Sequence, residues 1–280
     1  MSWYQYSGFA DEIDESLEKQ IAGLQKLGIP NIEPRGVDGK NITAFTVEEA
    51  KELKKRLDAG GISVSAIGSP IGKIQITDPF DDNLALLKHT IELAKVLDTR
   101  YIRVFSFFVD EADPCKHRDE VMRRMAAFAK AAEGTGITLL HENEGGVIYG
   151  QTSERCVDIF ETVGSENLKA TFDPGNCVYA GNDALEEYKI VEPYVEYLHI
   201  KDCLEGQKIV PAGEGKVQFK EILTLLRKRK DNIYISIEPH LVDFAGFSTF
   251  DNSGVKLEKG DNFGKFTLAF ENFKKIIENI

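Results

Sequence analysis

Short β-rich runs alternate with longer helical patterns about eight times along this chain, and this alternation restricts the folds that are open to it. The runs lie at residues 3–8, 31–33, 63–67, 101–105, 138–142, 168–173, 195–199 and 234–238, with no Pro/Ser-rich linker or low-complexity segment between them. Eight strands that are each followed by a helix favour an α/β fold closed into a (β/α)8 TIM barrel. One such barrel takes roughly 250 residues, so the 280 residues predict a single domain over 1–280.

Helical patterns fill the intervals between these runs. They are expected from Thr46 onward and at residues 15–27, 82–97, 119–134, 153–163, 185–191, 219–230 and 263–280. The helix at Thr46 begins with a capping box, in which Thr46 and Glu49 satisfy free amides at the helix start. Ala50, Leu53 and Leu57 then fall on one face of that helix, as the helical period requires.

An open, doubly wound parallel sheet is the alternative fold. Such a sheet usually carries a glycine-rich phosphate turn after its first strand. Here the turn reads Gly8-Phe9-Ala10-Asp11-Glu12 and lacks the G-x-G-x-x-G pattern. The sequence therefore favours the barrel.

Charge and composition argue against several classes of function. The sequence contains 34 Lys and Arg residues and 46 Asp and Glu residues, and the resulting net charge of −12 repels a phosphate backbone. No stretch approaches the roughly 18 apolar residues of a membrane span, and the start of the sequence has no signal-peptide pattern. The four cysteines are too widely spaced for a disulfide framework or a metal clip. We therefore expect a cytoplasmic protein with neither a nucleic acid nor a membrane as its partner.

Polar residues at the ends of four successive strands are the candidates for an active site, because barrel enzymes build their sites at the carboxyl ends of the strands. The last four β-rich runs end in Glu142, Asp173, His199 and Glu238, which lie 31, 26 and 39 residues apart. Each separation matches one strand-loop-helix unit, so the four side chains are expected on adjacent strands. Strand alternation places them inside the barrel with the residues two positions earlier, which are Leu140, Thr171, Tyr197 and Ser236.

Three carboxylates in one barrel mouth repel one another strongly unless a cation neutralises them, and a divalent metal is the usual solution. Carboxylate oxygens with a single imidazole suit Mn²⁺, Mg²⁺ or Co²⁺ somewhat better than Zn²⁺, which stays in the set. The alternative is that each acid is only a loop residue at the surface. We predict one divalent ion bound by Glu142, Asp173, His199 and Glu238.

Several motifs resemble those of the xylose isomerase-like TIM barrel family, which includes sugar isomerases, ketose 3-epimerases, inosose dehydratases and endonuclease IV. They run nearly end to end and comprise residues 7–12 (SGFADE), 141–143 (HEN), 171–176 (TFDPGN), 199–202 (HIKD), 211–215 (PAGEG) and 237–239 (IEP). The resemblance implies that the same four residues bind a single catalytic divalent metal. It also implies that Glu142 and Glu238 act as acid/base groups on the two faces of the substrate carbon, as in the epimerase branch.

Two departures from the epimerase pattern bear on the reaction. Asn176 stands where ketose 3-epimerases commonly have a substrate-contacting histidine. We expect Asn176 to bind substrate, but its amide cannot perform the proton chemistry of an imidazole. The segment after His199 contains Lys201 and Asp202, lacks the arginine of the epimerases and is closer to the dehydratase and uncharacterised isomerase-like branches. We predict that Lys201 is a catalytic and substrate-binding residue that polarises a carbonyl or holds a hydroxyl oxygen. The alternative is an ion pair of Lys201 with Asp202 or Glu214.

Charged residues of the second and fourth strands complete the set of candidates. Glu33 and Arg35 follow the second strand, and Arg103 lies within the fourth, where a charge needs a partner. We predict that Glu33 and Arg103 contact the substrate. The alternative pairs Arg35 with Glu33 or Asp38 as a structural ion pair at the barrel rim.

The expected chemistry begins with a metal-polarised carbonyl, which acidifies the neighbouring C–H so that one glutamate removes the proton to give an enediolate. Return of the proton gives an epimer or an isomer, and loss of a β-hydroxyl gives a dehydrated product. We therefore expect a divalent-metal-dependent sugar isomerase or epimerase, with an inosose dehydratase-like lyase and a non-catalytic sugar-binding barrel as alternatives. Phosphodiester cleavage as in endonuclease IV is disfavoured, because five histidines are too few for its three-zinc cluster. The expected partner is a small sugar or polyol-derived substrate, and a homo-oligomer is left open.

Overall fold

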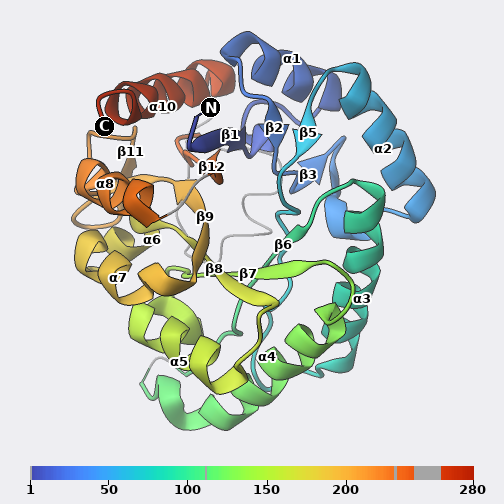
Figure 1. Cartoon of the computed structure of the whole chain (residues 1–280), viewed down its shortest axis with the longest axis vertical. Coiled ribbons are helices and arrows are strands. Elements are labelled where there is room, and N and C mark those ends of the chain that lie inside the picture. The colour runs from blue at the N-terminus through green and yellow to red at the C-terminus, as the bar shows by residue number, and fades with distance from the viewer. Residues whose placement is uncertain (1, 111, 230–231, 243–259) are drawn as a thin grey trace.

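A curled parallel sheet lies at the centre of the molecule and is surrounded by helices (Figure 1). The computed structural model describes residues 2–110, 112–229, 232–242 and 260–280. Six parallel strands form the main sheet in the order β1-β12-β9-β8-β7-β6. They are β1 (Tyr4–Gly8), β12 (Ile233–Ile237), β9 (Val195–Ile200), β8 (Leu168–Phe172), β7 (Thr138–Glu142) and β6 (Tyr101–Val104).

Two short parallel strands, β2 (Asn31–Ile32) and β5 (Ser63–Val64), fill the interval between β1 and β6. The amide of Glu33 donates to the last carbonyl of β1 at 3.0 Å, and the amide of Ile67 donates to the first carbonyl of β6 at 2.9 Å. These hydrogen bonds connect the short pair to both edges of the main sheet. The predicted closed (β/α)8 barrel is thereby confirmed, and a single domain over residues 1–280 stays a prediction.

The helices cover the outside of the barrel and alternate with the strands along the chain (Figure 1). They are α1 (Leu17–Leu27), α2 (Val47–Ala59), α3 (Asp81–Val96), α4 (Arg118–Ala132), α5 (Ser153–Val163), α6 (Pro174–Tyr179), α7 (Ala184–Val191), α8 (Phe219–Arg229) and α10 (Asn262–Ile277). The predicted capping box of α2 is confirmed, since the amide of Glu49 donates to Thr46 Oγ1 at 3.2 Å and the amide of Thr46 donates to Glu49 Oε2 at 2.6 Å.

The structure departs from the sequence prediction mainly in the segments that follow the strands. β5 ends at Val64 rather than at residue 67, because Ile67 forms only an isolated bridge with Ile102. Helix α6 and two antiparallel hairpins are also absent from the prediction. The predicted end of α8, Lys230, lies outside the described residues. The hairpins are β3 (Gly36–Val37) with β4 (Lys40–Asn41) and β10 (Asp202–Leu204) with β11 (Lys208–Val210).

Asp202 anchors the loop that contains the hairpin of β10 and β11. Its carboxylate accepts hydrogen bonds from the amides of Cys203, Gly213, Gly215 and Val217 at 2.8–3.1 Å. A single acidic side chain therefore organises the segment between β9 and α8. This role differs from the ion pair with Lys201 that was the alternative reading of the sequence.

Apolar packing divides into two clusters, as expected for a barrel with an inside and an outside. The smaller cluster holds Ala66, Tyr101, Leu140 and Tyr197, which lie inside the barrel. Their strand neighbours Leu139 and Leu198 belong to the large cluster beneath the helices. Glu142 and His199, each two residues beyond a member of the inner cluster, therefore share the inward face as predicted.

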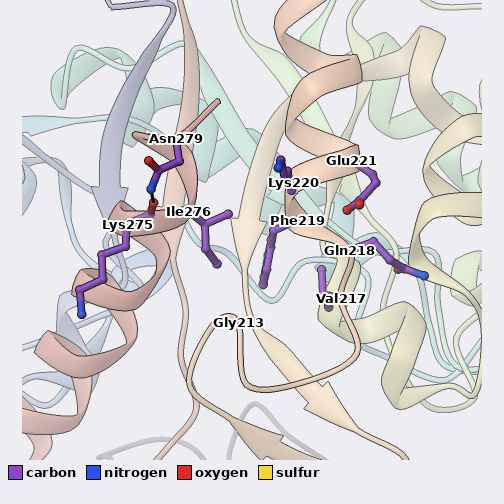
Figure 2. A pocket seen from close by; sticks show the side chains of 9 residues that line it. All are labelled: Gly213, Val217, Gln218, Phe219, Lys220, Glu221, Lys275, Ile276 and Asn279. Carbon is purple, nitrogen blue, oxygen red and sulfur yellow. Dashed lines mark hydrogen bonds between the residues drawn. The ribbon is translucent and has the colours of Figure 1, made fainter.

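A surface hollow of about 410 Å³ opens between the start of α8 and the end of α10 (Figure 2). Its lining residues are Gly213, Val217, Gln218, Phe219, Lys220, Glu221, Lys275, Ile276 and Asn279. It contains none of the residues predicted for the active site. Among the helices that the structure describes, none has the length and apolar character of a membrane span.

Candidate metal centre and active site

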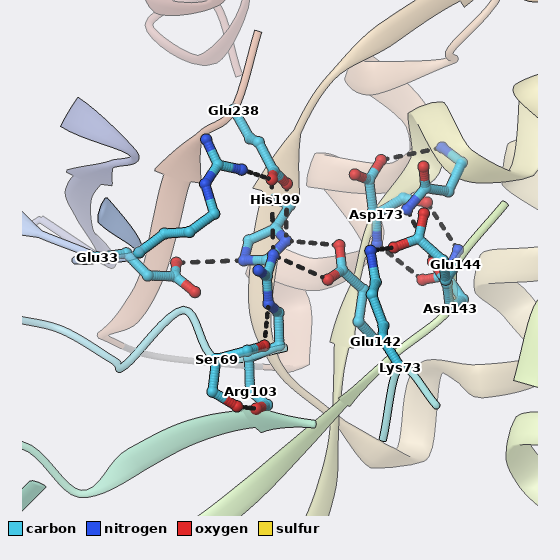
Figure 3. Close-up of polar contacts among 12 residues, drawn as sticks. Glu33, Ser69, Lys73, Arg103, Glu142, Asn143, Glu144, Asp173, His199 and Glu238 are labelled. Carbon is cyan, nitrogen blue, oxygen red and sulfur yellow. Dashed lines mark hydrogen bonds and ion pairs between the residues drawn. The ribbon is translucent and has the colours of Figure 1, made fainter. Parts of the chain in front are cut away.

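Glu142, Asp173, His199 and Glu238 converge inside one end of the barrel, and all four are at most 2% exposed (Figure 3). Glu142 is the last residue of β7, His199 lies near the end of β9, and Asp173 and Glu238 directly follow β8 and β12. One potential ligand atom from each residue lies within 4.8 Å of the others. The structure thus brings the predicted quartet together, as the strand spacing implied.

The imidazole of His199 lies between carboxylates on both of its edges (Figure 3). Nδ1 is 2.8 Å from Glu142 Oε1 and 3.4 Å from Glu238 Oε2, whereas Nε2 is 3.2 Å from Glu33 Oε2. Burial favours the neutral ring, but Glu33 and Glu142 outweigh it and raise the pKa of His199 well above its usual value. A carboxylate behind a ligating histidine fixes the ring's tautomer and orientation, so Glu33 is placed to aim Nδ1 into the quartet.

Two buried arginines bridge the glutamates of the quartet. Arg103 Nη1 lies 3.1 Å from Glu142 Oε2 and 3.5 Å from Glu238 Oε1. Arg35 Nη1 donates to the same Glu238 oxygen at 2.9 Å, and its other nitrogens bind Asp11 at 2.8 and 3.0 Å. These contacts orient both carboxylates and leave Glu238 Oε2, which is buried and accepts no hydrogen bond from the described residues, directed toward His199.

Asp173 takes its position from the start of α6, where it is the N-cap residue ahead of Pro174. Its Oδ1 accepts a hydrogen bond from the amide of Asn176 at 3.0 Å, and its Oδ2 lies 3.0 Å from Lys201 Nζ. Burial raises the pKa of Asp173 to about 6, although Lys201 opposes this shift. A Cβ on Gly175 would lie 2.6 Å from the carbonyl oxygen of Lys201, so only glycine allows α6 to approach β9 this closely.

The quartet fits a divalent cation on chemical grounds. Three carboxylates in contact at an effective dielectric constant near 20 repel one another by about 4 kcal/mol per pair at 4 Å. Glu238 Oε2, which accepts no hydrogen bond from the described residues, and the Nδ1 of His199 are ligand atoms of the type that Mn²⁺, Mg²⁺, Co²⁺ and Zn²⁺ accept. The donor set therefore suits a single divalent ion and does not distinguish among these metals.

A second group of potential ligands, comprising Glu12, Glu238 and His240, lies beside the quartet. The guanidinium of Arg35 already contacts all three residues, at 3.3 Å from Glu12 Oε1, 2.9 Å from Glu238 Oε1 and 3.4 Å from His240 Nε2. Burial raises the pKa of Glu12 to about 8 even though Arg35 opposes the shift. The guanidinium of Arg35 thus takes the place that a metal ion would have in this group, and the group holds Glu238 in position.

Among the other predicted residues, Glu33, Arg103 and Lys201 border the quartet, but their substrate contacts stay predictions. Asn176 is tied into the backbone, since its Nδ2 donates to the carbonyl of Asn143 at 2.9 Å, and its substrate role also stays a prediction. The alternative prediction that Arg35 pairs with Glu33 or Asp38 was wrong. Arg35 pairs with Asp11, Glu12 and Glu238.

Sequence reasoning missed several titratable residues at the same barrel mouth. They are Asp11, Glu12, Lys73, Glu144 and His240. Glu144 and His240 lie two residues beyond Glu142 and Glu238, so extending the alternation past the strand ends would have identified both. Lys73 lies on a loop without such a signal.

Known proteins resemble this chain over parts or all of its length. An inosose dehydratase of Clostridium perfringens is 28% identical over 100 residues, which span 36% of this chain and only 32% of that protein. A crystal structure of D-psicose 3-epimerase with D-tagatose from Clostridium cellulolyticum H10 aligns with a TM-score of 0.75 at 15% identity, covering 98% of this chain and 99% of that one. A xylose isomerase-like TIM barrel protein from Mycobacterium smegmatis in complex with magnesium aligns with a TM-score of 0.74 at 18% identity, covering 99% and 96%.

The family model for the xylose isomerase-like TIM barrel matches residues 21–250, which include the whole quartet. Together with the closed barrel and the four converging strand ends, this match identifies the chain as a member of the xylose isomerase-like TIM barrel family.

Proposed function

We propose that this protein is a divalent-metal-dependent sugar isomerase or epimerase that removes a proton next to a substrate carbonyl. Glu142, Asp173, His199 and Glu238 would hold the ion. When bound, a divalent ion acts as a Lewis acid that polarises the substrate carbonyl. The remaining chemistry falls to the side chains of the chain itself.

The observation that carries the proposal is the placement of two glutamates around one histidine. Glu142 and Glu238 come from strands that are separated in the sheet by β8 and β9, yet both reach His199 Nδ1. Arg103 contacts both carboxylates and keeps them in fixed positions. Two carboxylates that approach from different strands offer one base and one acid for proton transfer at a carbon between them.

Lys201, which pairs with Asp173 of the quartet, supports the same step. Its ammonium is 5% exposed, lies 3.0 Å from Asp173 Oδ2 and stays charged because the surrounding carboxylates outweigh burial and raise its pKa. A fixed ammonium can stabilise negative charge that develops on a substrate oxygen. We assign Lys201 this role and assign Glu33 and Arg103 to the orientation of the quartet and the substrate.

Dehydration is the second candidate, and two observations favour it. The curated relatives that match the chain are inosose dehydratases, although the matches span 32% and 45% of their lengths. Loss of a β-hydroxyl after proton removal also places negative charge on the departing oxygen, and the buried ammonium of Lys201 can stabilise that charge.

A screen of metal-loaded protein against ketoses, aldoses and inososes tests the proposal. We expect one class to be converted, with NMR and mass spectrometry identifying the product. An unchanged mass indicates isomerisation or epimerisation, and a product lighter by one water indicates dehydration. Binding without conversion of any compound would instead support a non-catalytic sugar-binding barrel and would contradict the proposal.

A further inference from the structure

Lys73 and Glu144 form an ion pair beside the quartet (Figure 3). Lys73 Nζ lies 2.6 Å from Glu144 Oε2, and the two side chains are 16% and 20% exposed. In the described part of the chain, Arg35, Arg103 and Lys201 at the same mouth are no more than 5% exposed. Within this group of charged residues, the pair is therefore the part that is most accessible to solvent.

The backbone holds Lys73 in place before any ligand arrives. Gly72 has a φ of +93°, and a Cβ at this position would overlap the carbonyl of Phe105. The amide of Gly72 donates to Asn83 Oδ1 at 3.0 Å, and its carbonyl accepts from the amide of Phe107 at 3.0 Å. Lys73 Nζ then lies 4.4 Å from the centre of the Phe105 ring, so the ammonium is a preorganised donor.

Glu144 is the acceptor of the pair and lies close to the reacting groups. It follows Glu142 by two residues beyond the end of β7, and its Oε1 accepts a hydrogen bond from the amide of Gly145 at 3.1 Å. The charges of both Lys73 and Lys201 act on its carboxylate. Together the pair offers one donor and one acceptor, which is the combination that a hydroxyl group can satisfy.

The buried charges of the quartet and its neighbours balance once a divalent ion is present. Four carboxylates and two cations meet there, namely Glu33, Glu142, Asp173, Glu238, Arg103 and Lys201. With His199 counted as the neutral imidazole that ligates a metal, their sum leaves two negative charges, which a divalent ion cancels. Further out, Asp11 pairs with Arg35 and Glu144 pairs with Lys73. An anionic substrate would thus add a charge that the described cations could neutralise only by breaking an existing pair.

We propose that Lys73 and Glu144 form a second substrate subsite, which binds hydroxyl groups remote from the reacting carbon and selects an uncharged polyhydroxylated substrate over its phosphate ester. This inference rests on the proposed function and specifies its substrate class. The ion pair discriminates because a hydroxyl can bridge ammonium and carboxylate, whereas a phosphate is attracted to Lys73 and repelled by Glu144.

The test compares neutral compounds with their phosphate esters by calorimetry on metal-loaded protein. The probes are D-fructose with D-fructose 6-phosphate, and myo-inositol with myo-inositol 1-phosphate. Wild-type protein should bind at least one neutral compound about tenfold or more tightly than its ester, the factor that one hydrogen bond to a charged group supplies. Lys73→Met should weaken the binding of the neutral compound about tenfold, and Glu144→Gln should strengthen the binding of the ester by a similar factor because it removes the carboxylate that repels the phosphate.

Glu48→Gln is the matched control, because it removes the same charge from an exposed ion pair with Lys51 on α2. It should change neither affinity, and thermal melting should show that all three variants are folded. A wild-type preference for an ester, no binding of any probe, or unchanged affinities in both site variants would overturn the inference. Binding of neutral probes with the expected variant effects, but without turnover of any sugar, would refute the proposed function and leave the subsite in place.

Discussion

Single replacements in the quartet are expected to weaken the retention of the divalent ion and to lower turnover by about 10²–10⁴-fold, the range of a positioned acid or base. The changes are Glu142→Gln, Asp173→Asn, His199→Ala and Glu238→Gln. Each removes or neutralises one of the four ligand groups, whose atoms lie within 4.8 Å of one another, and all four residues are buried. Elemental analysis after gel filtration should find about one ion per wild-type chain and a clear loss in each variant.

Glu166→Gln is the control for charge removal, because Glu166 is 97% exposed and pairs only at the surface with Lys169. It should retain the metal and the turnover of the wild type. Removing the ion with a chelator should also lower the melting temperature of wild-type protein, since a ligand that binds only the folded state stabilises it by mass action. Full metal occupancy in all four quartet variants would show that the ligand assignment is wrong.

Lys201→Met is expected to lower turnover of the metal-loaded protein by about 10²–10⁴-fold with a much smaller effect on its melting temperature. Methionine keeps the apolar stem but deletes the ammonium that lies 3.0 Å from Asp173. In the metal-loaded protein the ion supplies countercharge to Asp173, so the loss of stability from breaking this buried pair is reduced. Steady-state kinetics and thermal melting of the same preparation measure both effects.

Asp202→Asn provides a contrast at the neighbouring position. The carboxylate of Asp202 accepts hydrogen bonds from four backbone amides, so this change should lower the melting temperature while the ammonium of Lys201 stays in place. If Lys201→Met instead behaved like Asp202→Asn, with lower stability and unchanged turnover, Lys201 would be a structural anchor.

The sequence predicted the barrel well because the evidence for it is local. The alternation of strand and helix patterns, the capping box at Thr46 and the inward face shared by Leu140 and Glu142 all follow from residue spacing within one element. The meeting of four strand ends also follows, because consecutive parallel strands lie side by side. Spacing alone therefore placed Glu142, Asp173, His199 and Glu238 together.

Pairings between distant loops could not be predicted in the same way. Arg35 pairs with Glu238, 203 residues away, and with Asp11, which follows β1. The sequence offered Glu33 and Asp38 as nearer partners, and only the closed barrel brings the true ones into reach. The loop of Lys73 likewise depends on the packing of Gly72 against Phe105, which no periodic pattern encodes.

Solvent deuterium exchange tests the central claim most directly, because proton removal next to a carbonyl is common to isomerisation, epimerisation and dehydration. Metal-loaded protein is incubated in heavy water with any ketose, aldose or inosose that it converts. We expect deuterium at the carbon next to the carbonyl, detected by NMR and as a mass shift. Glu142→Gln or Glu238→Gln, whichever retains metal, should lose net conversion while exchange at one face persists through the remaining carboxylate. Conversion of substrate without any incorporation of solvent deuterium would contradict proton abstraction by these two glutamates.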